Sequence, residues 1–173
     1  MPGHRPEAIA NAFLGMAGGA GRLTQIHIQK LVYIAHGWML GLSGEPLVNC
    51  EPEAWDRGPV FTGLREYIKM AGSSPIKRQI RENDRDPRAF LGYRNPGRVI
   101  SAHLGDYEEK VMDRVWAKYG RMNAFRLTHL THLPETPWSK VYNNGWGRNE
   151  LIPDDVTKEY YKKLAQDAKK RTS

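Results

Sequence analysis

Apolar residues recur along this chain at intervals of three and four residues, the spacing that places them on one face of an α-helix. The clearest stripe predicts a helix over 25–40, with Thr24 as its N-terminal cap and the glycines at 41 and 44 permitting its end. The members of this stripe are Ile28, Leu31, Val32, Ala35, Trp38, Met39 and Leu42. We therefore expect one long helix to pack into the core.

Several other segments share the helical pattern, and each ends at a glycine, an asparagine or a proline. The predicted helices are 6–17, 60–71, 106–119, 123–132, 138–142 and 154–169. Gly120 is expected to act as the glycine that ends the helix over 106–119. The final helix is expected to bury Val156, Tyr160 and Leu164, which are spaced four residues apart.

The central part of the chain, rich in proline and glycine, cannot form one continuous helix. Residues 90–93 and 98–101 are predicted to pair as a short hairpin across the Asn-Pro-Gly turn at 95–97. The predicted fold class is mainly α. It is a compact, single-domain helical bundle over 1–173 with a small β hairpin in the central insertion.

The charge of the chain is unevenly distributed. Its 173 residues include 26 Lys and Arg against 19 Asp and Glu, which gives a net charge of +7. Residues 73–105 and 158–171 each carry a net charge of +4, and the rest is almost neutral. A basic segment can attract nucleic acid or an acidic protein, and it can equally be a solvated surface. Composition alone leaves these three interpretations open.

The compartment follows from what the chain lacks. No stretch approaches the roughly 18 consecutive apolar residues of a membrane span, so we expect no membrane partner. Cys50 is the only cysteine, which excludes an intramolecular disulfide framework and suits a reducing cytoplasm. We expect the Cys50 thiol to be buried and inert.

No constellation of residues supports a named reaction. The glycine-rich run over 15–24 lacks the spacing of a phosphate-binding loop and follows a predicted helix rather than a strand. His129 and His132 would share one helix face, but no third metal ligand is secured, so His132 is expected to be structural. His27 and His36 are expected at the surface or half-buried. The sequence thus predicts no catalytic residue, metal or cofactor.

Two tryptophans lie at stiffened corners. Trp55 precedes Gly58-Pro59, and Trp138 follows Pro137, so proline restricts the backbone beside each indole. Exposed Trp and Arg side chains on such corners are typical anchors of protein interfaces. The alternative is that both tryptophans hold their loops to the core.

The residues at these corners resemble a known family. The relevant segments are QKLVYIAHGW at 29–38, GEPL at 44–47, EAWDRGPV at 53–60, TH at 131–132, PW at 137–138, and IP at 152–153 before YY at 160–161. In this order they resemble the motifs of the Panacea domain family, which includes SocA-like antitoxins and phage-associated GepA-type proteins. The resemblance covers 6–72 and 104–165. It leaves 73–103 as a variable basic insertion and 166–173 as a frayed tail.

The resemblance implies a function as well as a fold. Members of the family are antitoxins that bind a cognate protein toxin directly, and SocA-like members are described as adaptors that deliver the toxin to the ClpXP protease. Others lie in prophages. The family offers no catalytic residues, and its motif residues are expected to be structural. In this chain they are Lys30, Leu31, Tyr33, Trp38, Ala54, Trp55, Gly58, Pro59, Val60, Thr131, His132, Pro137 and Trp138.

The resulting hypothesis is a cytoplasmic bacterial or phage antitoxin that is not an enzyme. The residues expected to contact the toxin are Trp55, Arg57, Pro59, Val60, Arg81, Arg85 and Arg94. One alternative is a regulator that binds nucleic acid through 73–103 and the lysine-rich C-terminal helix. Another is a metal-dependent enzyme that uses His129 and His132.

Overall fold

The computed structural model describes residues 3–16 and 18–172, and in this part of the chain the fold is mainly α, as predicted. The helices are α1 (Pro6–Leu14), α2 (Gln25–Ser43), α3 (Thr62–Ile68), α4 (Pro87–Phe90), α5 (Asp106–Tyr119), α6 (Ala124–His132), α7 (Pro137–Tyr142) and α8 (Asp154–Thr172). Two 3₁₀ turns, η1 (Lys69–Ala71) and η2 (Asn143–Gly145), extend α3 and α7. The strands are β1 (Glu53–Trp55) and β2 (Gly58–Val60).

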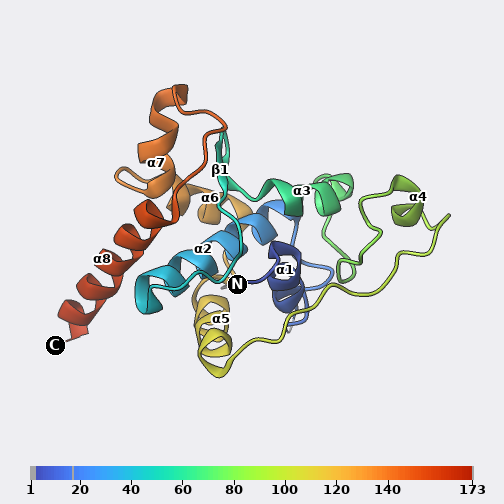
Figure 1. The fold of residues 1–173 in the computed structure, drawn as a ribbon, viewed down its shortest axis with the longest axis horizontal. Helices are drawn as coiled ribbons and strands as arrows, with labels where there is room; N and C mark the ends of the chain where they lie inside the picture. Colours follow the sequence, from blue (N-terminus) through green and yellow to red (C-terminus); the bar gives the residue numbers. More distant parts are fainter. Residues whose placement is uncertain (1–2, 17, 173) are drawn as a thin grey trace.

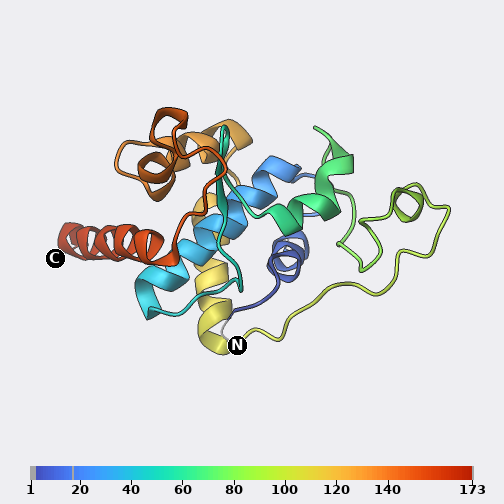
Figure 2. The ribbon, with the colours of Figure 1, turned by 45° about the horizontal axis from the view of Figure 1, so that its top comes forward.

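The central element is α2, which contacts α1, α3, α5, α6, α8 and β2. Figures 1 and 2 show it crossing the middle of the molecule with the other helices around it. Its predicted start is confirmed, since Thr24 is the N-cap and its hydroxyl accepts the His27 backbone N–H. The helix ends at Gly44, whose left-handed φ of 80° breaks it, rather than near Leu40.

The two glycines inside α2 have a packing role. A Cβ on Gly37 would lie 2.2 Å from the Tyr161 ring, and one on Gly41 would lie 2.6 Å from the Tyr161 backbone. The bare backbone of α2 therefore forms the slot that receives α8. For this reason α8 buries Thr157 and Tyr161, and the prediction that Val156 lies on its inner face is wrong.

The prediction of a hairpin over 90–93 and 98–101 is also wrong. Residues 87–90 form α4, which Asp86 caps, and Val99 instead forms an isolated bridge with Arg81. The buried side chain of Asn11 holds this region, because it donates to the carbonyls of Ile80 and Ile100 at 2.8 and 2.7 Å. Its own carbonyl accepts the Ile80 N–H at 2.6 Å. Residues 98–100 thus pair with 80–82 instead of 90–93, since the Ile100 N–H donates to the Ile80 carbonyl at 3.1 Å and the Glu82 N–H donates to the Arg98 carbonyl at 2.9 Å.

The small sheet of the structure lies earlier in the chain. β1 and β2 pair antiparallel, with Glu53 opposite Val60 and Trp55 opposite Gly58, so that Asp56 and Arg57 form the turn. The segment after η2 lines the other edge of β1, where the backbone N–H of Asn149 donates to the Ala54 carbonyl at 2.7 Å. The hairpin is therefore held on both sides despite the short length of its strands.

Several local expectations need correction. His36 is completely buried rather than at the surface. Its Nε2 donates to Asp154 at 2.9 Å, and its Nδ1 accepts the Val48 N–H at 3.2 Å. Cys50 is exposed rather than buried, although partial desolvation and the nearby carboxylates raise the pKa of its thiol to about 11. Gly120 follows the last residue of α5 in the right-handed conformation and not in the left-handed one. A glycine is needed there for space, because a Cβ would lie 2.6 Å from Trp116.

The ends of two helices also differ from the predicted bounds. α1 ends at Leu14, and residue 17, the predicted end, lies outside the described residues. α8 continues through 166–172, the segment that the resemblance leaves as a frayed tail. No helix within 3–16 and 18–172 has both the length and the apolar character needed to cross a membrane.

The slot between α2 and α8 gives a direct prediction. Gly37→Ala should lower the free energy of unfolding by about 1–3 kcal/mol, because the new methyl group overlaps the Tyr161 ring. Gly63→Ala is the matched control. Gly63 is also a helical glycine, but a Cβ there would meet only a Glu7 carboxylate oxygen at 3.6 Å. The control should be neutral or gain up to about 1 kcal/mol in urea denaturation. Equal effects of the two substitutions would contradict this packing.

Candidate functional site

The hairpin lies directly on the polar side of α2. Gly58 has a φ of +108°, and a Cβ on it would lie 3.0 Å from Nζ of Lys30 and 3.0 Å from Oγ1 of Thr131. Only glycine fits this position, for reasons of both backbone conformation and space. Nζ of Lys30 donates to the Pro59 carbonyl at 3.1 Å, so the lysine fixes the strand that follows the turn.

The neighbouring glutamine of α2 holds the end of the same strand. The Gln29 side chain accepts the Phe61 backbone N–H at 2.9 Å and donates to the Phe61 carbonyl at 3.0 Å. The Gln29 amide thereby makes the two hydrogen bonds that a neighbouring strand would make to the backbone of Phe61. Two consecutive side chains of one buried helix thus position residues 58–61.

A stack of three rings supports the turn from the other side. His132 of α6 stacks on Trp138 of α7 with ring centroids 4.0 Å apart, and Trp138 stacks on Tyr142 at 4.5 Å. The Trp138 indole N–H donates to the Trp55 carbonyl at 2.7 Å. The Tyr142 hydroxyl donates to the Asp56 carboxylate at 2.7 Å. The turn is therefore anchored through both its backbone and its acidic side chain.

The structure brings six of the thirteen motif residues into this one cluster. Lys30, Gly58, Pro59, Thr131, His132 and Trp138 meet behind the hairpin, although they come from α2, β2, α6 and α7. Leu31, Tyr33 and Trp38 instead face the core and α8, and the Trp38 indole donates to the Tyr119 hydroxyl at 3.2 Å. Motifs that are scattered in sequence thus contribute to two packing contacts, one between α2 and the hairpin and one between α2 and α8.

A groove runs along the hairpin, with a volume of about 510 Å³. Its lining residues are Gln25, Ile26, Gln29, Lys30, Trp55, Asp56, Arg57, Val60, Arg65, Arg148 and Asn149. These supply four cationic side chains and one carboxylate. The Trp55 ring forms part of the wall, and the guanidinium of Arg65 lies 5.2 Å from its centroid. The groove is a basic surface with an aromatic wall.

The carboxylate in the groove already has partners. Asp56 accepts the Tyr142 hydroxyl, and its Oδ1 lies 2.7 Å from Nε of Arg148. These two contacts lower the pKa of Asp56. It therefore stays ionised and held by these two partners. Among the described residues Arg57 has no carboxylate within 4.0 Å, and Arg65 has only a long contact of 3.8 Å with Glu66.

Lys30 is electrostatically unusual. Lys30 is only 2% exposed, and burial lowers the pKa of its ammonium from 10.5 to about 7. Among the described residues it has one hydrogen-bond acceptor, the Pro59 carbonyl, and no carboxylate within 4.0 Å. At the floor of the groove the protein therefore holds a buried lysine without a counter-ion.

A second polar group beside Lys30 is also incompletely satisfied. Nε2 of His132 is buried and has no hydrogen-bond partner among the described residues. Desolvation and the Lys30 charge both lower the pKa of this imidazole, which is therefore neutral at pH 7. Across 3–16 and 18–172 no group of three His, Cys, Asp or Glu side chains has the arrangement of a metal site.

The predicted contact residues do not form one surface. Trp55, Arg57 and Val60 line the groove, whereas Pro59 is buried behind it. Three arginines of the insertion lie elsewhere. Arg81 donates to the Gly97 carbonyl at 3.0 Å, Arg85 lies 5.8 Å from the Tyr67 ring, and Arg94 pairs with Asp86 at 2.7 Å. Figures 1 and 2 show α4 of this segment far from α7 and the hairpin.

Sequence reasoning missed two arginines of the groove. Arg65 lies on α3, five residues after the motif that ends at Val60, and Arg148 follows η2. For Arg65, the helical pattern over 60–71 provided a signal, since it places Arg65 outside the apolar stripe. For Arg148 nothing local indicated proximity, because the contact depends on how residues 146–151 pack against β1.

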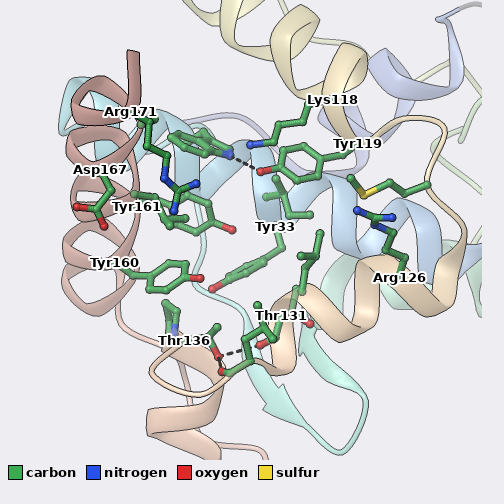
Figure 3. Close-up of a pocket in the computed structure, with 18 residues that line it drawn as sticks. Tyr33, Lys118, Tyr119, Arg126, Thr131, Thr136, Tyr160, Tyr161, Asp167 and Arg171 are labelled. Atoms are coloured by element: carbon green, nitrogen blue, oxygen red, sulfur yellow. Dashed lines mark hydrogen bonds between the residues drawn. The ribbon is translucent and has the colours of Figure 1, made fainter. Parts of the chain in front are cut away.

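A second cavity, of about 330 Å³, lies between α2 and α8 (Figure 3). Five aromatic side chains line it: Tyr33, Trp38, Tyr119, Tyr160 and Tyr161. In Figure 3 the Tyr33, Tyr160 and Tyr161 hydroxyls point into the same space, and Lys118, Arg126, Asp167 and Arg171 surround it. Burial raises the pKa values of Tyr33 and Tyr161, so both phenols stay protonated. Tyr161 is also the residue that occupies the glycine slot, so this cavity is part of the α2–α8 contact.

The burial of Lys30 predicts a specific dependence of stability on pH. Because the unfolded lysine titrates near 10.5 and the folded one near 7, this residue makes stability rise with pH between these values. Lys30→Met should remove that rise. It should also stabilise the protein by about 1–3 kcal/mol at pH 7, after the loss of the bond to Pro59.

The measurement is urea denaturation between pH 6 and 10.5. The matched control is Lys162→Met, an exposed lysine of α8, which should change stability by less than about 0.5 kcal/mol. A Lys30→Met variant that keeps the pH slope of the wild type would contradict the assigned burial.

Comparison with known proteins agrees with this arrangement. The sequence model of the family described as antitoxin SocA-like, Panacea domain matches residues 28–139, which include α2, the hairpin and Trp138. The matched range also runs through the basic segment 73–103. No solved structure matches the chain.

A curated relative extends the similarity. The chain is 33% identical over 144 residues to antitoxin SocA of Caulobacter vibrioides (strain NA1000 / CB15N), an alignment that covers 82% of this chain and 72% of the relative. The range that the family model matches contains the hairpin and the two glycines of α2, Gly37 and Gly41. This chain belongs to the family of SocA-like antitoxins with a Panacea domain.

Proposed function

We propose that this protein is the antitoxin of a toxin–antitoxin pair and that it neutralises a cognate protein toxin by binding it through the hairpin groove. Membership of the SocA-like family supports the antitoxin role. The observation that carries the choice of surface is the groove itself, which combines Trp55 and Arg57 of the anchored hairpin with Arg65 of α3. Tryptophan and arginine dominate the energetics of protein interfaces, and a rigid site loses little entropy on binding.

The proposed mechanism is occlusion. A toxin held on the groove would have its active or target surface covered for as long as the complex lasts. Delivery of the bound toxin to the ClpXP protease is a second part of the proposal, which the resemblance to SocA-like members supports. Both parts would take place in the bacterial cytoplasm, and both need the same direct complex.

Direct binding of nucleic acid is less well supported by the charges of the insertion. Its carboxylates pair with three of its six arginines, since Asp86 pairs with Arg88 and Arg94, and Asp84 pairs with Arg78 at 2.8 Å. Phosphate binding depends on cations that are free to replace counter-ions. These ion pairs therefore reduce the number of free cations that the insertion offers to a phosphate backbone.

The test is co-expression with the product of the adjacent gene, followed by affinity purification and titration calorimetry. The product should arrest growth alone, and the wild-type chain should rescue growth and retain the product through purification. Trp55→Ala should weaken the complex about thirtyfold or more, because its indole forms the groove wall.

The matched control is Tyr93→Ala, which removes an aromatic ring that is 83% exposed but lies in the insertion. This substitution should leave the affinity within about twofold. A harmless product, or a complex that does not survive purification, would end the antitoxin proposal. A complex weakened by Tyr93→Ala and not by Trp55→Ala would move the interface away from the groove.

A further inference from the structure

We propose that the groove is a carboxylate-binding site, in which the ammonium of Lys30 receives an Asp or Glu side chain from an acidic segment of the toxin. This proposal rests on the antitoxin function proposed above. It is carried by one juxtaposition, a buried lysine without a counter-ion at the floor of a groove that three arginines line.

The first argument concerns the cost of burying Lys30. An ammonium removed from water is unfavourable unless a hydrogen-bonded anion compensates it, and proteins rarely bury lysine unpaired. Here one carbonyl occupies one of its three donors, and burial alone accounts for the lowered pKa. The side chain of Lys30 is thus fully packed, but its ammonium lacks an anionic partner. A carboxylate from outside would supply the missing charge.

The second argument concerns the sign of the surrounding charges. Arg57 and Arg65 line the groove, and its one carboxylate, Asp56, is held by Tyr142 and Arg148. Arg57 has no carboxylate within 4.0 Å among the described residues, and Arg65 has only a long contact of 3.8 Å with Glu66, which lies outside the groove. Guanidinium groups bind carboxylates through paired hydrogen bonds, which gives orientation as well as attraction. An acidic segment therefore meets complementary charge along the whole groove.

The third argument favours a protein over a nucleic acid. The groove walls include the apolar surfaces of Ile26, Trp55 and Val60, which suit the methylene groups and neighbouring side chains of a peptide. A phosphate backbone needs a track of free cations, and three of the six arginines of the insertion are paired with its own carboxylates.

Anion binding would have a spectroscopic signature. The groups that face Lys30 are His132 of α6, which burial keeps neutral, and Arg57 of the turn, with Arg65, Arg148 and Asp56 further along the groove. None of these supplies a negative charge to Lys30. A carboxylate in contact with its Nζ would therefore raise the pKa of Lys30 from about 7 toward 10.5.

The experiment has two arms, which separate this proposal from the antitoxin proposal. In the first, calorimetry measures the binding of the co-expressed toxin to wild type, Lys30→Met and Lys162→Met. The two variants lose the same formal charge, but only one loses it from the groove. Lys30→Met should weaken the complex about thirtyfold or more, and Lys162→Met by less than about twofold. Arg65→Gln, whose side chain is half-exposed, should give a smaller loss in the same direction.

In the second arm, NMR of the ¹⁵N-labelled Lys30 side chain follows its pKa during titration with two probes. The probes are N-acetyl-hexaglutamate amide and a single-stranded oligonucleotide of equal charge. The peptide should raise the Lys30 pKa by at least one unit, and the oligonucleotide should raise it by less. These shifts do not depend on whether the toxin is identified.

Each outcome decides the proposal. A tight toxin complex that Lys30→Met leaves unchanged overturns the carboxylate site and leaves the antitoxin function standing. A failure of all variants to bind the toxin removes the antitoxin function, and the peptide titration then decides the anion site alone. A Lys30 pKa that does not respond to hexaglutamate, or that responds more to the oligonucleotide, overturns the proposed acidic protein segment.

Discussion

The close approach of the hairpin to α2 is the constraint on which the proposed toxin-binding surface depends. A Cβ on residue 58 would lie 3.0 Å from Nζ of Lys30, and the backbone there has a φ of +108°, so this approach requires glycine. Once the strand is there, Lys30 and Gln29 hold its carbonyls and N–H groups from below. The ring stack of α6 and α7 holds the turn from the side. The orientation of Trp55 and Arg57 follows from these contacts and not from the two-stranded sheet, which is too short to be stable alone.

The same arrangement lowers the stability of the folded protein, because it buries the ammonium of Lys30. A methionine at residue 30 would fill the volume of the lysine without the loss of hydration, so packing alone does not explain an ammonium there. Residues retained at such a cost are common where a protein binds or reacts, because function requires the group that stability disfavours. In this fold the cost falls where the family motifs converge, between the core and an exposed basic groove. The motif residues therefore hold the hairpin on α2 on one side and line the proposed binding groove on the other.

The sequence predicted the parts of the fold that depend on local pattern. The bounds of α5, Asp106–Tyr119, and the cap at Thr24 follow from helical spacing and from residues adjacent in the chain. The hairpin over 90–101 was wrong because residues 98–100 pair with the backbone of 80–82, and Asn11, some 70–90 residues away, holds both segments through its side chain. His36 was misplaced for a similar reason, since its partners Val48 and Asp154 come from distant segments. For the site, the pattern identified Trp55 and Arg57, but it grouped them with arginines that the fold places elsewhere, and it missed Arg148. Convergence in space is a tertiary property that no local signal encodes.

The central claim is that the hairpin groove is the surface that holds the toxin. Hydrogen–deuterium exchange of the protein alone and in its toxin complex tests it most directly, because each backbone amide reports its own protection. The account predicts slower exchange in the complex at 53–60 and 146–151, with no change at 81–94. Protection confined to 81–94 or to α8, with the hairpin amides unchanged, would contradict it.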